Sequence, residues 1–175
     1  NLLSSRCKKT GSLYWLFFLF NIFMGYGQLI SDSILVEGHY RSFHFNKPDP
    51  ASTRESLLFV MHGSGGEGKQ MQRHTQRLEA LAMKDNILIV YPDGYKRYWN
   101  ECRKMSTAEA NKIDINEQLF FESMIAYFHK NYGIKKDQVF AAGFSGGGHM
   151  AYKLALTMPQ QFRAIAAIVA NMPDS

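Results

Sequence analysis

The chain has 175 residues, of which 46% are hydrophobic and 20% are charged, a composition that fits one globular domain with a sizeable apolar core. Its formal net charge is +5, but residues 1–27 contribute three basic side chains and no acidic ones, so the remainder is nearly neutral. This balance argues against a nucleic-acid-binding protein and against binding to a charged membrane surface.

Residues 1–27 have the pattern of a secretory signal peptide. A basic start is followed by the apolar run Leu13–Met24 and then by Gly25 and Gly27, small residues where a signal peptidase reads, so cleavage is expected before Gln28. The apolar run is shorter than the roughly 20 residues that a membrane helix needs, which argues against a stable membrane anchor. The sequence therefore predicts a secreted or periplasmic protein with a single domain over residues 28–175.

Short apolar strands and helical segments follow the leader. Ser33–Asn46 alternates apolar and polar residues around Gly38 and predicts two paired strands. Ser56–His62 and Asn86–Gly94 are continuous apolar runs, typical of strands that are buried on both faces. Between them, Gln70–Lys84 has apolar residues at helical spacing and predicts one helix.

The second half continues the alternation after a polar, irregular stretch at residues 95–112. Ile115–Tyr132 predicts a helix with an apolar stripe that Gly133 ends. The elements expected after it are a strand, a helix and a strand, at Gln138–Phe144, Gly147–Met158 and Ala164–Ala170. Strands that alternate with helices indicate an α/β fold built on a parallel sheet.

The stretch "GFSGG" at residues 143–147 fits the motif G-x-S-x-G between a predicted strand and a predicted helix. A tight strand-to-helix turn projects the serine hydroxyl clear of the sheet, and the helix start offers free N–H groups to an anion. Ser145 is therefore predicted as a nucleophile, with the Gly146 N–H as a donor to the oxyanion. The alternative is a glycine-rich turn with a capping serine.

A second glycine cluster, "GSGGEG" at residues 63–68, also follows a predicted strand. It matches G-x-G-x-x-G, and with Lys69 it matches all but the last position of a P-loop. Gln70 cannot supply the hydroxyl that a P-loop uses for Mg²⁺, and Asp93 lies in a Pro-Asp-Gly turn that explains it without a ribose. A nucleotide site is therefore disfavoured.

A hydrolase explains both clusters together. Its second oxyanion donor comes from a His-Gly-Gly type of loop after an earlier strand, and "HGSGG" at residues 62–66 would supply the Ser64 N–H. His62 is interpreted mainly as a hydrogen-bonding support of this loop, and it is also a candidate substrate contact.

Three segments, "LLFVMHGSGG", "ILIVYPDGYKRYWNE" and "QVFAAGFSGGGHMAYKLALTMPQQFRAIAAI", resemble secreted polyhydroxybutyrate depolymerase-like and feruloyl esterase-like α/β-hydrolases over Ser56–Pro173. The resemblance implies an α/β-hydrolase fold, with a mostly parallel sheet and helices on both faces. It also implies hydrolysis of esters in polyesters or plant polysaccharides by Ser, Asp and His, without a metal or other cofactor. It places the nucleophile on Ser145 and the oxyanion donors on Ser64 and Gly146.

The resemblance also places a wall of the substrate cleft near Tyr98, Trp99 and Asn100, and Trp99 is a loop aromatic that is a candidate for stacking on a sugar or phenol. The family often has Trp-Asn-Asp there, whereas this chain has Glu101 after Asn100. No role is transferred to Asp114, because the family's paired aspartates are absent. Cys102 has no cysteine partner within the exported part of this sequence.

The family's acid and base follow the nucleophile, and the candidates after Ser145 are His149 and Asp174. His149 lies on the helix that starts at the nucleophile, so it is interpreted as a packing or cleft-lining residue. We therefore expect an N-terminal portion of a longer enzyme, inactive by itself, with the catalytic Asp and His beyond Ser175. The alternatives are a serine peptidase on the same fold and a non-catalytic, exported carbohydrate-binding protein.

Overall fold

The structure is a computed structural model that describes residues 28–48, 55–103 and 106–172. The signal peptide expected over residues 1–27 lies outside these ranges. Within them, every helix is too short or too polar to cross a bilayer.

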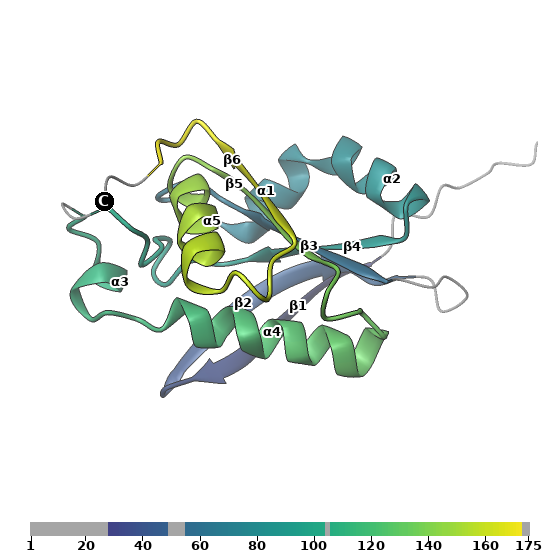
Figure 1. Cartoon of the computed structure of the whole chain (residues 1–175), viewed down its shortest axis with the longest axis horizontal. Coiled ribbons are helices and arrows are strands. Elements are labelled where there is room, and N and C mark those ends of the chain that lie inside the picture. The colour runs from purple at the N-terminus through teal and green to yellow at the C-terminus, as the bar shows by residue number, and fades with distance from the viewer. Residues whose placement is uncertain (1–27, 49–54, 104–105, 173–175) are drawn as a thin grey trace, which may run out of the picture.

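A six-stranded sheet with the strand order β1-β2-β4-β3-β5-β6 forms the centre of the molecule (Figure 1). The strands are β1 (Leu29–Val36), β2 (His39–Asn46), β3 (Ser56–Met61), β4 (Ile87–Pro92), β5 (Val139–Phe144) and β6 (Ala164–Ile168). The helices are α1 (Gly68–His74), α2 (Gln76–Lys84), α3 (Glu109–Lys112), α4 (Glu117–Tyr132) and α5 (Gly146–Thr157). Strands β4, β3, β5 and β6 run parallel, whereas β1 pairs with β2 and β2 with β4 in antiparallel fashion. The predicted α/β-hydrolase fold is confirmed.

The hairpin β1–β2 closes through a two-residue turn. Glu37 and Gly38 both have positive φ angles, 47° and 84°, as a tight hairpin turn of the mirror-image type requires. Val36 then pairs with His39 across the turn. The two paired strands predicted around Gly38 are thus confirmed.

Helices cover both faces of the sheet, and each face has its own apolar core. The larger core joins the sheet to α4 and α5 and includes Phe59, Phe121 and Leu154. The smaller one joins the opposite face to α1 and α2, where Val60 packs near Ala82. Successive residues of β3 therefore enter different cores, which explains why its sequence is continuously apolar.

Helix α4 begins and ends close to its predicted limits. Asn116 caps it, because its side-chain oxygen accepts a hydrogen bond from the Leu119 N–H at 3.0 Å. Gly133 ends it in the left-handed conformation with φ 72°. The expected stop at Gly133 is confirmed.

The single helix predicted over Gln70–Lys84 is wrong, because the structure has two helices that meet at Thr75. The Thr75 backbone leaves helical geometry at φ −114° and ψ 22°, and its hydroxyl bonds the Met71 carbonyl and the Tyr91 hydroxyl, both at 2.9 Å. Of the apolar residues that gave the helical spacing, Ala82 is buried in the smaller core, whereas Leu81 is 58% exposed. Short helix α3 likewise lies in a stretch that was expected to be irregular.

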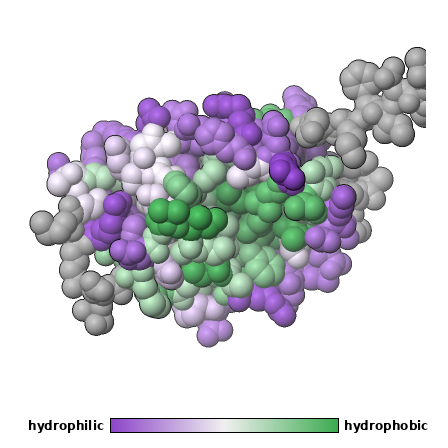
Figure 2. Space-filling view, turned by 90° about the horizontal axis from the view of Figure 1, so that it is seen from above, coloured by the Kyte–Doolittle hydropathy of each residue, from purple (hydrophilic) through white to green (hydrophobic). Residues whose placement is uncertain are grey.

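Strand β6 pairs with β5, and no described strand pairs with its other edge. Large apolar side chains at its end and just after it are exposed, with Ile168 51%, Val169 74% and Met172 65% accessible. Figure 2, which views the molecule from above the orientation of Figure 1, shows a broad apolar area on this face. The β6 side of the sheet is therefore far less covered than the β3 and β4 centre.

Candidate active site

Ser145 occupies a sharp turn between β5 and α5. Its backbone has φ 53° and ψ −115°, a conformation that is strained for any residue with a side chain. Two hydrogen bonds hold it there: the Ser145 N–H donates to the Ile168 carbonyl at 2.8 Å, and the His149 N–H donates to the Ser145 carbonyl at 3.0 Å. Such a strained serine at a strand-to-helix turn is the geometry that presents a nucleophile.

Gly147 allows the first turn of α5 to pack directly on the end of β3. A Cβ atom at Gly147 would lie 2.5 Å from the Met61 carbonyl oxygen and 2.6 Å from the His62 carbonyl oxygen. No side chain fits at these distances, so the glycine is a requirement of packing. The turn that carries Ser145 is thereby pressed against the loop that follows β3.

The two glycine-rich loops predicted from the sequence lie against each other. A Cβ at Gly146 would be 3.0 Å from the Ser64 backbone nitrogen and 2.5 Å from the Ser64 hydroxyl, and one at Gly63 would be 3.5 Å from the Ser145 Cβ. The structure thus brings Ser64, Ser145 and Gly146 together. Two backbone N–H groups at such a place can bind one developing negative charge.

His62 supports this loop with both of its ring nitrogens. Its Nε2 lies 2.9 Å from the Gly94 backbone nitrogen, which can only donate, so Nε2 accepts and the proton resides on Nδ1, which donates to the Gly63 carbonyl at 2.7 Å. Burial lowers the pKa of His62 and outweighs the opposing effects of the Gly63 hydrogen bond and the Asp93 charge. His62 is only 3% exposed and both of its ring nitrogens are engaged within the protein, so its observed role is the support of the loop that the sequence suggested.

Trp99 is buried, which corrects its expected role in substrate stacking. Only 2% of its surface is exposed, and its indole N–H donates to the His62 carbonyl at 2.9 Å. The ring packs beside that of His62, with centroids 4.9 Å apart. Trp99 therefore fixes the loop from below, and the neighbouring Tyr98, 41% exposed, is the aromatic side chain that reaches the surface.

Asp93 is a site residue whose role sequence reasoning missed. Its Oδ1 accepts from the Gly68 N–H at 2.6 Å, and its Oδ2 accepts from the Ser42 hydroxyl at 2.8 Å and lies 2.9 Å from His44 Nε2. Burial by itself would raise the pKa of Asp93, but the hydrogen bonds from His44, Gly68 and Ser42 lower it to about 2. The available signal was an aspartate directly after a buried strand, in a Pro-Asp-Gly turn.

One turn therefore clamps both ends of the loop that carries Ser64. Gly94 holds the His62 ring at the end of β3, and Asp93 holds the Gly68 N–H at the start of α1. A Cβ at Gly68 would lie 2.5 Å from the Tyr91 carbonyl oxygen, so the backbone of the loop packs directly on the backbone of β4 with no room for a side chain between them. The position of Ser64 is thus set by β4 as well as by β3.

A cavity of about 330 Å³ opens beside these loops. Its walls come from residues 62–67, from the α1 residues Gln70, Met71 and His74, and from Phe144 next to the candidate nucleophile. Phe144 is 45% exposed, so an apolar ring borders the cavity at Ser145. The lining mixes apolar and hydrogen-bonding groups.

Ser145 has no base among the described residues. All six histidines of the chain are described, and no hydrogen bond joins any of their rings to the Ser145 hydroxyl. His149 is half-buried, and its Nδ1 is buried without a hydrogen-bond partner in the described part of the chain. Nor do the described residues gather three His, Cys, Asp or Glu side chains closely enough to hold a metal ion.

The family model described as "Putative esterase" matches residues 38–172. A curated relative, "Putative esterase NocK" from Nocardia uniformis subsp. tsuyamanensis, is 27% identical over 145 residues, which cover 81% of this chain and 41% of the relative. "Feruloyl esterase B" from Neurospora crassa is 28% identical over 120 residues, covering 69% of this chain and 40% of the relative. The chain thus spans about two fifths of the length of these relatives.

Solved structures share the fold. The substrate-bound fluorophosphonate-binding serine hydrolase F from Staphylococcus aureus superposes with a TM-score of 0.63 at 20% identity, covering 83% of this chain and 58% of that one. At this identity the structural similarity establishes the fold of the chain alone. The chemistry has to be inferred from the geometry of the site.

Proposed function

The chain belongs to the "Putative esterase" family, and from this premise we propose that the full-length protein hydrolyses carboxylic esters with Ser145 as its nucleophile. The observation that supports this most is the direct contact between two loops distant in sequence. Ser64 and Gly146 meet at backbone distance beside a serine that is held in a strained turn. A glycine-rich turn with a purely structural serine would need neither the strain nor the second loop.

The proposed reaction is acyl transfer through an acyl-enzyme. The Ser145 oxygen attacks the ester carbonyl carbon while its proton passes to a base, and the Ser64 and Gly146 N–H groups hold the resulting oxyanion. The carbonyl reforms as the alcohol leaves with a proton, and water then releases the acid and restores the serine. Removal of one oxyanion donor costs about 2.7–4 kcal/mol in enzymes of this kind.

The base that activates Ser145 is proposed to come from a part of the full-length protein outside these 175 residues. The support is that all six histidines are described and that none of their rings bonds the serine hydroxyl. A serine without a base is a weak nucleophile, so we expect the 175-residue chain by itself to turn over esters very slowly or not at all.

The proposed substrates are feruloyl or acetyl esters of plant polysaccharides, ahead of a polyhydroxyalkanoate-type polyester. A relative named as a feruloyl esterase supports this order. The cavity beside Ser145 supports it too, because Phe144 and Met71 offer apolar contacts while Gln70 and His74 offer hydrogen bonds. We further propose that residues 1–27 direct export and that 28–175 belong to a cofactor-independent α/β-hydrolase domain.

The test is covalent labelling of the full-length protein with a fluorophosphonate, followed by peptide mapping. We expect one label on Ser145, none in Ser145→Ala, and full labelling in the matched control Ser33→Ala, which changes an exposed serine of β1. A folded protein that takes up no label would refute the proposed nucleophile and favour the carbohydrate-binding alternative. Parallel assays with methyl ferulate, p-nitrophenyl acetate and a peptide would separate an esterase from a peptidase.

A further inference from the structure

Glu101 is a buried carboxylate whose hydrogen-bonding partner is its near neighbour Arg103. The Glu101 side chain is 1% exposed. One of its oxygens pairs with the Arg103 Nε, and the other accepts from the Arg103 backbone N–H at 2.7 Å. A buried charge needs a paired and hydrogen-bonded partner, so the carboxylate fixes the direction of the Arg103 side chain.

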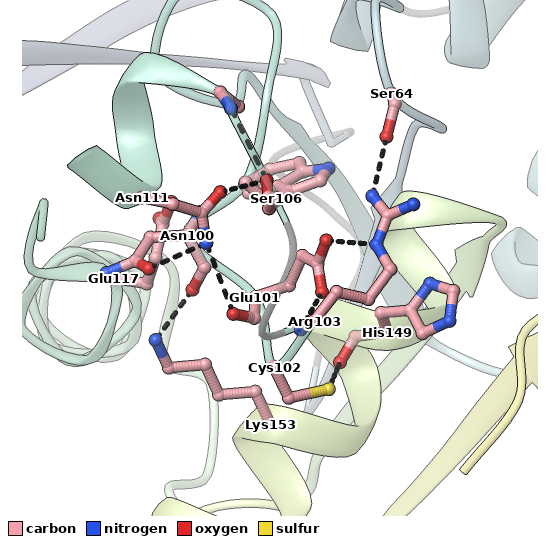
Figure 3. A network of polar contacts seen from close by, with 12 residues as sticks. Ser64, Asn100, Glu101, Cys102, Arg103, Ser106, Asn111, Glu117, His149 and Lys153 are labelled. Carbon is pink, nitrogen blue, oxygen red and sulfur yellow. Dashed lines mark hydrogen bonds and ion pairs between the residues drawn. The ribbon is translucent and has the colours of Figure 1, made fainter. Parts of the chain in front are cut away.

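The fixed guanidinium reaches the candidate oxyanion loop. Arg103 Nη2 donates a hydrogen bond to the Ser64 hydroxyl at 3.2 Å, and Figure 3 shows the contacts running from Glu101 through Arg103 to Ser64. The same hydroxyl lies against Gly146, where a Cβ would be 2.5 Å away. Ser64 is thus held between a cation and the first residue of α5.

The segment that carries Glu101 and Arg103 is itself anchored to α5. Lys153 donates to the Asn100 carbonyl at 2.6 Å, and the Cys102 thiol donates to the His149 carbonyl at 3.5 Å (Figure 3). Helix α5 also carries Gly146. The guanidinium and the second oxyanion donor are therefore held relative to the same helix, although they come from different parts of the sequence.

Resting on the proposed function, we propose that Arg103 is a positioning residue that holds Ser64 in the orientation its N–H needs to bind the oxyanion. Ser64 is otherwise an exposed loop residue whose hydroxyl forms no hydrogen bond with a described side chain other than Arg103. The Glu101–Arg103 pair supplies a fixed point for the loop at Ser64, in addition to the Asp93 and Gly94 turn that holds its two ends. Arg103 acts through Ser64 and does not itself need to touch the ester.

The test is a double-mutant cycle on the rate at which a fluorophosphonate labels Ser145 in the full-length protein. We expect Arg103→Ala to slow labelling about five- to tenfold, in line with the loss of one solvent-exposed hydrogen bond of ordinary net strength. Ser64→Ala, which keeps the backbone N–H, should slow it by a similar factor, and the double variant should be little slower than either single one. The matched control is Arg163→Ala, an exposed arginine away from the site.

Arg103→Lys should recover part of the rate, because a lysine ammonium can still donate to the hydroxyl. Glu101→Gln should slow labelling, because it releases the guanidinium. If Arg103→Ala is poorly folded by thermal unfolding, Arg103→Gln replaces it in the cycle. Equal labelling rates in the wild type and the Arg103 variants, or fully additive effects of Arg103 and Ser64, would overturn the positioning role while Ser145 labelling persists. Absence of any label on Ser145 in the wild type would instead overturn the proposed function.

Discussion

The two loops that meet at the candidate site are held in place by different means. The nucleophile turn, residues 143–148, is fixed by close backbone packing, and Gly147 meets the carbonyls of Met61 and His62 at distances that exclude a side chain. The oxyanion loop, residues 62–68, is fixed by side-chain hydrogen bonds from His62, Trp99 and Asp93. The first loop is therefore sensitive to volume, and the second is sensitive to hydrogen bonding and to pH.

This difference bears on how each half of the site could fail. Close packing either fits or forces the backbone apart, so a small change in the nucleophile turn has a large effect. A set of hydrogen bonds can lose one member and keep the others, so changes in the oxyanion loop should be graded. Substitutions in the two loops should therefore differ in the size of their effect on stability.

Gly147→Ala should break the nucleophile turn. Its Cβ would lie 2.5 Å from a carbonyl oxygen, so β3 and α5 must separate, and we expect a loss of at least about 3 kcal/mol in the free energy of unfolding. Urea denaturation measures it. Gly133→Ala is the contrasting control: that glycine has a positive φ, which Gly147 does not, but nothing lies within 4 Å of its added Cβ, so about 1 kcal/mol is expected from the left-handed backbone alone. If the two variants lost similar amounts of unfolding free energy, the claim that close packing at Gly147 holds the nucleophile turn would be wrong.

His62→Ala should cost about 3 kcal/mol, because a buried ring and two hydrogen bonds disappear and the Gly94 N–H loses its acceptor. Since burial lowers the pKa of His62 below its unfolded value near 6.5, the unfolded state takes up a proton first. Wild-type stability should therefore fall as the pH drops below about 6.5. Urea midpoints at pH 7.5, 6.5 and 5.5 should show this slope in the wild type and its loss in the variant. If His62→Ala shows the same pH dependence of the urea midpoint as the wild type, another titrating group causes that dependence.

Asp93→Asn should cost about 2 kcal/mol near neutral pH, because an amide cannot replace a carboxylate that accepts three hydrogen bonds. The native pKa of about 2 lies below the unfolded value of about 3.9, so the carboxylate stabilises the fold above pH 4, and this contribution is lost as the pH falls from 4 to 2. Wild type and variant should therefore converge in thermal unfolding at low pH. A difference in melting temperature between wild type and variant that stays constant with pH would exclude the carboxylate charge as the cause of that difference.

Trp99→Phe should have the smallest effect, about 1 kcal/mol, because the ring stays buried and only the hydrogen bond from the indole N–H to the His62 carbonyl is lost. Thermal unfolding measures it. In the full-length protein, fluorophosphonate labelling should slow only slightly. If labelling slowed greatly while the melting temperature stayed unchanged, Trp99 would contact the substrate after all, which its buried position argues against.

The sequence was most informative where a feature is local. The turn at Ser145 and the stop at Gly133 depend on residues that are adjacent in the chain, and both elements lie where they were predicted. The meeting of Ser64 with Ser145 followed from the hydrolase interpretation, in which a loop after an earlier strand supplies the second oxyanion donor.

Features that depend on distant partners were missed. The break at Thr75 arises from a hydrogen bond to Tyr91, and the role of Asp93 arises from Ser42, His44 and Gly68. Trp99 lies in a loop, where an aromatic often faces solvent, but the His62 carbonyl and the core of α4 cover it. None of these contacts leaves a periodic pattern in the sequence.

The edge of β6 that no described strand covers has a practical consequence for handling the 175-residue chain. A strand with unpaired backbone N–H and C=O groups is a template for a strand of another molecule, and exposed side chains such as Ile168 and Val169 strengthen such pairing. Lysine or proline is the usual protection at such an edge, and β6 contains neither. Concentrated preparations should therefore form soluble multimers or precipitate through this edge, and a charged replacement of Ile168 should raise the concentration at which they stay dispersed.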